Sequence, residues 1–117
     1  MDATIKNALG TITLSEDLIA TIVGAAASEN YGIVGMNSNS VGDAWFQLIG
    51  SENLKRGVKV TVNEDSSVNI ELHVTLMYGV SFPAVAQNAI SNVKYCVEGL
   101  TGLKVNYVDI HVEAVRV

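Results

Sequence analysis

Strict alternation of apolar and polar residues over two runs, 58–62 and 68–76, constrains this chain more than any other feature. Alternation of this kind is typical of strands that bury one face and leave the other in water. The polar stretch 64–67 between the runs has the length of a hairpin loop. We therefore predict an antiparallel hairpin with one apolar face.

An apolar stripe at helical spacing follows the second strand. Ser81 can cap the helix, Pro83 is tolerated in a first turn, and Gly99 and Gly102 are suited to its end. We expect this stripe to lie on the apolar face of the hairpin. Its members are Phe82, Val85, Ala86, Ala89, Ile90, Val93, Cys96, Val97 and Leu100.

The N-terminal third predicts an arm, a strand, a helix and a second strand. Residues 1–9 are expected to form a flexible arm, and the alternating run 11–14 a short edge strand. Ser15 can cap a helix with an apolar stripe over 18–26. The glycine-punctuated segment 31–36 indicates a short strand.

The C-terminal segment 103–115 alternates as well, but its apolar residues switch from odd to even positions at Tyr107–Val108. One extra residue there would restore a single buried face, so we predict a β-bulge. The crossover through the helix predicts that this strand runs parallel to 68–76. The expected fold is α+β: residues 1–117 form a single two-layer domain, with a mixed sheet of four or five strands and two helices on one face, in the order β-α-β-β-β-α-β.

Composition narrows the classes of function. The chain has 117 residues and a net charge of −5, from seven basic and twelve acidic side chains, which disfavours binding to nucleic-acid phosphates. The lone Cys96 cannot form an intramolecular disulfide, and its place on the helix stripe predicts an inert, buried thiol. Neither a signal peptide nor a run long enough to span a membrane is found, so we expect a cytoplasmic protein.

Five titratable side chains fall on the polar face of the strands 68–76 and 103–115. If these strands are neighbours, the face gathers enough imidazole and carboxylate ligands for a divalent metal. An ordinary solvated sheet face is the alternative, and the spacing motifs of known metal sites are absent. The five residues are Glu71, His73, Asp109, His111 and Glu113.

Two other segments suggest interactions. Trp45 and Phe46 lie in a polar, glycine-flanked stretch and form a candidate partner interface, because aromatic side chains dominate interface energies. The alternative is a turn folded back onto the core. Residues 32–35 match the Gly-x-x-Gly loop of RNA-binding KH domains, although a strand fits them better. Nucleophile–base orders, phosphate-binding loops and dinucleotide fingerprints are not present.

Read in order, several short pieces make the chain resemble the alkaline shock protein family of small bacterial proteins. They are Gly10-Thr-Ile-Thr-Leu-Ser15, Tyr31-Gly-Ile-Val-Gly-Met36, Arg56-Gly-Val-Lys-Val60, Tyr78-Gly79, Val97-Glu-Gly-Leu-Thr-Gly-Leu103 and Val108-Asp-Ile-His-Val112.

This resemblance implies a non-catalytic scaffold or adaptor in envelope stress and homeostasis, without catalytic residues or cofactors. It also implies self-association into a homo-oligomer and protein partners that are membrane-anchored or linked to lipid metabolism. The protein would then reach the membrane through a partner. Long members carry charged tails that this chain lacks, so functions located in such tails are not expected here.

Overall fold

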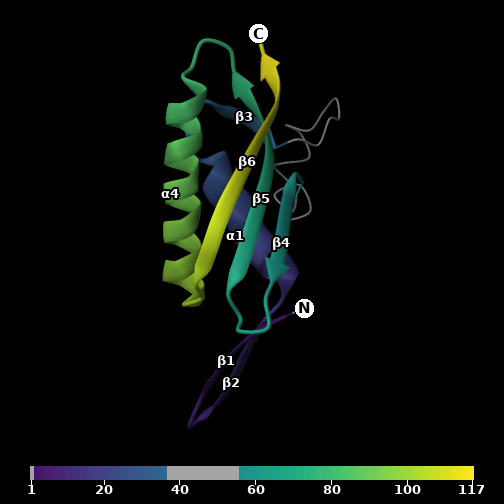
Figure 1. Cartoon of the computed structure of the whole chain (residues 1–117), viewed down its shortest axis with the longest axis vertical. Coiled ribbons are helices and arrows are strands. Elements are labelled where there is room, and N and C mark those ends of the chain that lie inside the picture. The colour runs from purple at the N-terminus through teal and green to yellow at the C-terminus, as the bar shows by residue number, and fades with distance from the viewer. Residues whose placement is uncertain (1, 37–55) are drawn as a thin grey trace.

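The computed structural model describes residues 2–36 and 56–117. Its elements, in chain order, are β1 (Ala3–Asn7), β2 (Gly10–Leu14), α1 (Glu16–Ser28), β3 (Ile33–Met36), β4 (Val58–Val62), β5 (Val68–Met77), α4 (Phe82–Thr101) and β6 (Val105–Arg116). Strands β3 to β6 form one sheet, and β1 and β2 form another that projects from the end of the body (Figure 1).

Strand β5 is the centre of the four-stranded sheet, because the other three strands all pair with it. The amides of His73 and Met77 donate to Gly57 and Gly32, on the side where β4 and β3 follow one another end to end. β6 lies along the opposite edge for the whole length of β5 and runs parallel to it, while β3 and β4 are antiparallel. The predicted hairpin, crossover and mixed sheet are therefore confirmed.

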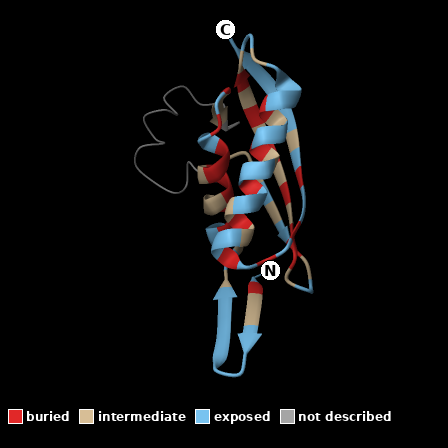
Figure 2. Cartoon of the chain, turned by 90° about the vertical axis from the view of Figure 1, so that its left-hand side faces the viewer, coloured by how far each residue is buried: buried red, intermediate tan, exposed pale blue. Residues whose placement is uncertain are grey.

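Both helices cover one face of this sheet, as predicted, and contact each other there (Figures 1 and 2). Alternate residues of β5 point into this layer and are fully buried or nearly so. They form the core together with one stripe of each helix. The buried β5 residues are Val68, Ile70, Leu72, Val74 and Leu76.

Helix α4 begins and ends where the sequence indicates. Ser81 Oγ accepts from the Ala84 amide at 3.4 Å, and Gly102 closes the helix in the left-handed conformation. Its buried stripe is narrower than predicted: Leu100 is 73% exposed. The buried positions recur every four residues, so the line of contact turns by about 40° at each step and leaves Leu100 behind. They are Val85, Ala89, Val93, Val97 and Thr101. Cys96 is half-buried beside the core rather than inside it.

The expectation of a flexible arm over residues 1–9 is wrong for Ala3–Asn7, which form strand β1. Ala3 is fully buried, and the backbone of Thr4 both donates to and accepts from Ser66 Oγ in the β4–β5 turn. These non-local contacts hold β1 against the body. β2 is a strand as predicted, but it pairs with β1 rather than with the edge of the main sheet.

The predicted bulge in β6 exists, although it lies between Val105 and Tyr107 rather than at 107–108. Asn106 is the extra residue. Its side-chain nitrogen Nδ2 lies 2.9 Å from Ser67 Oγ and 3.0 Å from Asn69 Oδ1. A second irregularity at Glu113 was not predicted. Both bulges change which side chains reach the outer face.

The KH interpretation of residues 32–35 is wrong, because Ile33–Met36 pair with β5 as a strand. Gly32 forms the preceding turn with φ +96°, and a Cβ there would lie 2.8 Å from Val85 on α4. Glycine is required at this position by both its conformation and its packing.

Candidate functional site

The outer face of the main sheet is the one opposite the two helices. Among residues 2–36 and 56–117, no helix or strand covers it (Figure 1). The two-residue period of a strand places Glu71 and His73 of β5 on this face, while their neighbours Ile70 and Leu72 enter the core. β6 contributes His111 and Glu113 to the same face.

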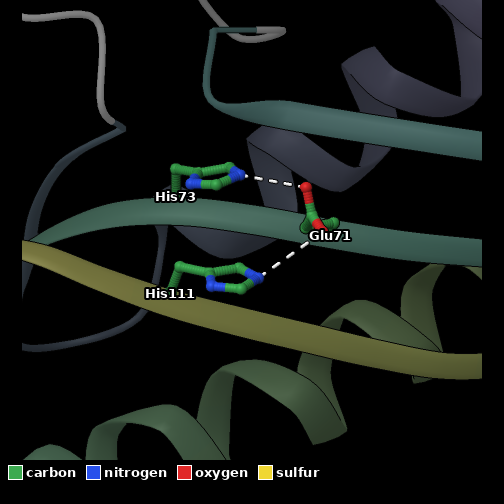
Figure 3. A group of neighbouring side chains, drawn as sticks. All are labelled: Glu71, His73 and His111. Atoms are coloured by element: carbon green, nitrogen blue, oxygen red, sulfur yellow. Dashed lines mark hydrogen bonds and ion pairs between the residues drawn. The ribbon is translucent and has the colours of Figure 1, made fainter.

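The two histidines are register partners across the parallel β5–β6 pair. Their rings stack with centroids 4.7 Å apart and planes 11° from parallel. Both rings point along the strands toward Glu71, as Figure 3 shows. The two strands are neighbours, which was the condition for the metal hypothesis, and their pairing brings His73 and His111 together.

Glu71 faces both rings with different oxygens. His73 Nε2 lies 3.1 Å from Glu71 Oε2, and His111 Nε2 lies 3.5 Å from Glu71 Oε1 (Figure 3). One potential ligand atom from each of these three residues lies within 4.8 Å of the other two. We call Glu71, His73 and His111 the histidine–glutamate cluster.

Glu113 holds His73 from the other side, with Oε2 at 2.6 Å from Nδ1. The strand irregularity between Val112 and Ala114 makes Glu113 the extra residue of β6, and its side chain thereby reaches back to His73. An ionised carboxylate only accepts hydrogen bonds, so Nδ1 carries a proton and donates it.

These contacts change the protonation of the cluster. The hydrogen bond with Glu113, followed by that with Glu71, raises the pKa of His73 above its ordinary value of 6.5. The hydrogen bond with His73 is the largest effect on Glu71 and lowers the pKa of that carboxyl, against an opposing effect of desolvation. The cluster therefore favours the ionised form of Glu71 beside the protonated form of His73.

Of the five predicted residues, the structure brings four into contact. Asp109 is the register partner of Glu71, but it is exposed and lies outside the cluster. The sequence could name Glu113 as a member of the face but not its contact with His73, because strand alternation does not reveal a bulge. Trp45 and Phe46 lie outside the described residues.

Comparison with known proteins identifies the family of this chain. Residues 4–117 match the model of the alkaline shock protein 23 family, described as having a cell envelope-related function. The chain belongs to this family. The resemblance drawn from short sequence pieces is confirmed.

Relatives within the alkaline shock protein family cover nearly the whole chain. YloU of Bacillus subtilis is 37% identical over 118 residues, which cover 100% of this chain and 98% of YloU. Spy1614 of Streptococcus pyogenes is 36% identical over 109 residues, covering 92% of this chain and 89% of that protein. Both carry the description "uncharacterized protein". No solved structure matches significantly. Neither described helix combines the length and hydropathy of a membrane-spanning segment.

Proposed function

We propose that this chain is a non-catalytic scaffold or adaptor that supports cell-envelope homeostasis through self-association and protein partners. It works in the cytoplasm and reaches the membrane periphery through a membrane-anchored partner or one linked to lipid metabolism. The envelope-related description of the family supports the setting. The absence of catalytic sequence motifs supports a role in binding rather than in reaction.

The observation that carries the proposal is the outer edge of β6. This strand has 12 residues and pairs with β5 on one side, and within 2–36 and 56–117 no strand pairs with its other side. An open strand edge presents unpaired amides and carbonyls that another strand can complete. The edge is partly apolar, since Val112 and Val115 are 37% and 39% exposed.

The two bulges define the part of β6 that is regular enough to pair. They lie at Asn106 and Glu113, so Tyr107–Val112 is the uninterrupted segment. A second copy of the chain offers the same segment, and two copies related by a two-fold axis would pair antiparallel. Asp109 limits this association, because charged residues on an edge oppose uncontrolled pairing. We therefore propose a closed homodimer as the unit of self-association.

Sedimentation over a concentration series tests this proposal. The wild-type protein should show a dimer whose population falls in Val112→Glu, because the substitution places a charge on the apolar edge that the second copy would cover. Gln87→Glu adds the same charge on the exposed side of α4 and should leave the dimer unchanged. A monomeric wild-type protein at all concentrations, or equal effects of both variants, would contradict pairing through β6.

Trp45 and Phe46 remain a separate proposal for partner docking. The double variant Trp45→Ala/Phe46→Ala should lose partner binding while circular dichroism shows a preserved fold. If the variant is folded and keeps both its mass and its partner, the segment does not serve as the interface. Because the β6 variants leave this segment intact, the two experiments separate self-association from partner docking.

A further inference from the structure

We propose that Glu71, His73 and His111 bind a single zinc-class divalent cation on the outer face of the sheet, with Glu113 as the positioning residue for His73. This inference goes beyond the scaffold function and does not depend on it. Imidazole nitrogens with one carboxylate are a donor set that suits Zn²⁺.

The spacing of the donors supports the proposal. Zinc bonds to nitrogen or oxygen of about 2.0–2.2 Å at tetrahedral angles place neighbouring donor atoms about 3.3–3.6 Å apart. The two separations between a histidine Nε2 and a Glu71 oxygen, 3.1 and 3.5 Å, lie near this range, although each runs to a different oxygen of the carboxylate. Because the two rings are stacked 11° from parallel, at least one of them must turn before both Nε2 lone pairs point at one cation.

The hydrogen bonding of His73 is the second, independent observation. Its Nδ1–H donates to Glu113 at 2.6 Å, which in the neutral ring leaves the Nε2 lone pair facing the Glu71 carboxylate at 3.1 Å. Two electron pairs at that distance repel unless a positive charge lies between them. A proton on Nε2 supplies that charge in the free protein, and a metal ion can replace the proton.

The Glu113–His73 pair also has the arrangement found around histidine ligands in metalloproteins. Such ligands usually donate their second ring N–H to a carboxylate, which fixes the tautomer and orients the ring. In this chain the β6 bulge delivers that carboxylate. The structure thus contains both the direct ligands and the group that positions one of them.

The ligands also lie on a rigid support. His73 and Glu71 alternate with the fully buried Ile70, Leu72 and Val74 of β5, and His111 is fixed opposite His73 by the strand register. Sites on strands with buried opposite faces hold their geometry better than sites on loops. Three protein ligands leave one tetrahedral position for water.

The test uses the full chain without a polyhistidine tag, stripped with EDTA and titrated with Zn²⁺ by calorimetry. We expect one Zn²⁺ per chain, with release on return of EDTA. Co²⁺ should give the intense visible bands of tetrahedral coordination. Imidazole nitrogen NMR should show His73 bound through Nε2 with Nδ1 still protonated.

Variants decide whether the cluster is the site. His73→Gln, His111→Gln and Glu71→Gln should each abolish stoichiometric binding, whereas Glu113→Gln should weaken it about 10–100-fold. Asp109→Asn is the matched control, because it removes a carboxylate from the same face next to Glu71 but outside the cluster. It should bind Zn²⁺ as the wild type does.

Three results would overturn the proposal. They are the absence of saturable Zn²⁺ binding by the wild type, unchanged binding by the ligand variants, or an equal loss in Asp109→Asn. The last result would indicate diffuse attraction of cations to an acidic face. Circular dichroism of each variant excludes misfolding, and the three independent ligand substitutions keep the test decisive if one of them fails to fold.

Discussion

The two faces of β5 are built from alternate residues of one ten-residue strand, yet they do different work. The inner face consists of aliphatic side chains that exclude water, and its contribution depends on volume and packing. The outer face carries Glu71 and His73, whose contribution depends on where particular nitrogen and oxygen atoms lie. One strand can thus hold the fold with half of its residues and position a chemical group with the other half.

The largest expected contrast is between neighbours on opposite faces. Leu72→Ala should lower the free energy of unfolding by about 2–5 kcal/mol, because it leaves a cavity where a side chain is 0% exposed. Denaturant titration would measure this loss. A cost below that of an ordinary surface substitution would show that the inner face does not carry the stability.

Asn106→Ala should have an intermediate effect of about 1 kcal/mol, because it removes the side-chain contacts with Ser67 and Asn69 that accompany the first β6 bulge. Denaturant titration gives the magnitude, and amide exchange across β5–β6 should show whether the register loosens. Exchange confined to residue 106 itself would mean that the bulge is maintained by packing alone.

His73→Ala should have a small effect on stability, about 0.5 kcal/mol or less in metal-free protein, because the residue lies on the open face. The same substitution should remove Zn²⁺ binding. Thermal unfolding with and without Zn²⁺ would separate the effect on stability from the effect on Zn²⁺ binding. Only the wild type should be stabilised by the ion. A large loss in metal-free protein would place His73 among the structural residues instead.

The smallest expected effect is on the pH dependence of folding stability in EDTA-treated protein. The pKa of His73 is raised in the folded state, so the stability that it adds is fully present below 6.5 and is lost as pH rises through the folded value. Glu113→Gln should bring the NMR titration of His73 closer to 6.5 and flatten this loss. An unchanged titration would show that Glu113 does not control the ring.

The sequence predicted most of the main sheet because the signals there are local. Alternation over 58–76 defines the hairpin, and the crossover rule gives the parallel β6 without any structural information. The strand order was left open, and the structure supplied the pairing that places His73 beside His111. The strand β1 was missed although its partner β2 is adjacent in the sequence. Its contact with Ser66, 62 residues away, could not be predicted.

The first bulge was predicted from the switch of apolar positions but placed slightly too late, and the second was not predicted. Asn106 bonds to Ser67, and no pattern near residue 106 encodes that partner. The contact of Glu113 with His73 accompanies the second bulge, and no pattern near residue 113 encodes that partner. The width of the α4 stripe was overestimated because the buried positions recur every four residues and leave Leu100 on the exposed side.

The end-to-end arrangement of β4 and β3 along one edge of β5 has a consequence for cooperativity. That edge pairs with two separate strands, β4 and β3, which meet near His73. The other edge of β5 pairs with the single strand β6. Because the four-residue β3 pairs with β5 separately from β4, we expect β3 to open locally while the β4–β5 hairpin stays closed. The histidine–glutamate cluster lies at the boundary between β3 and this hairpin.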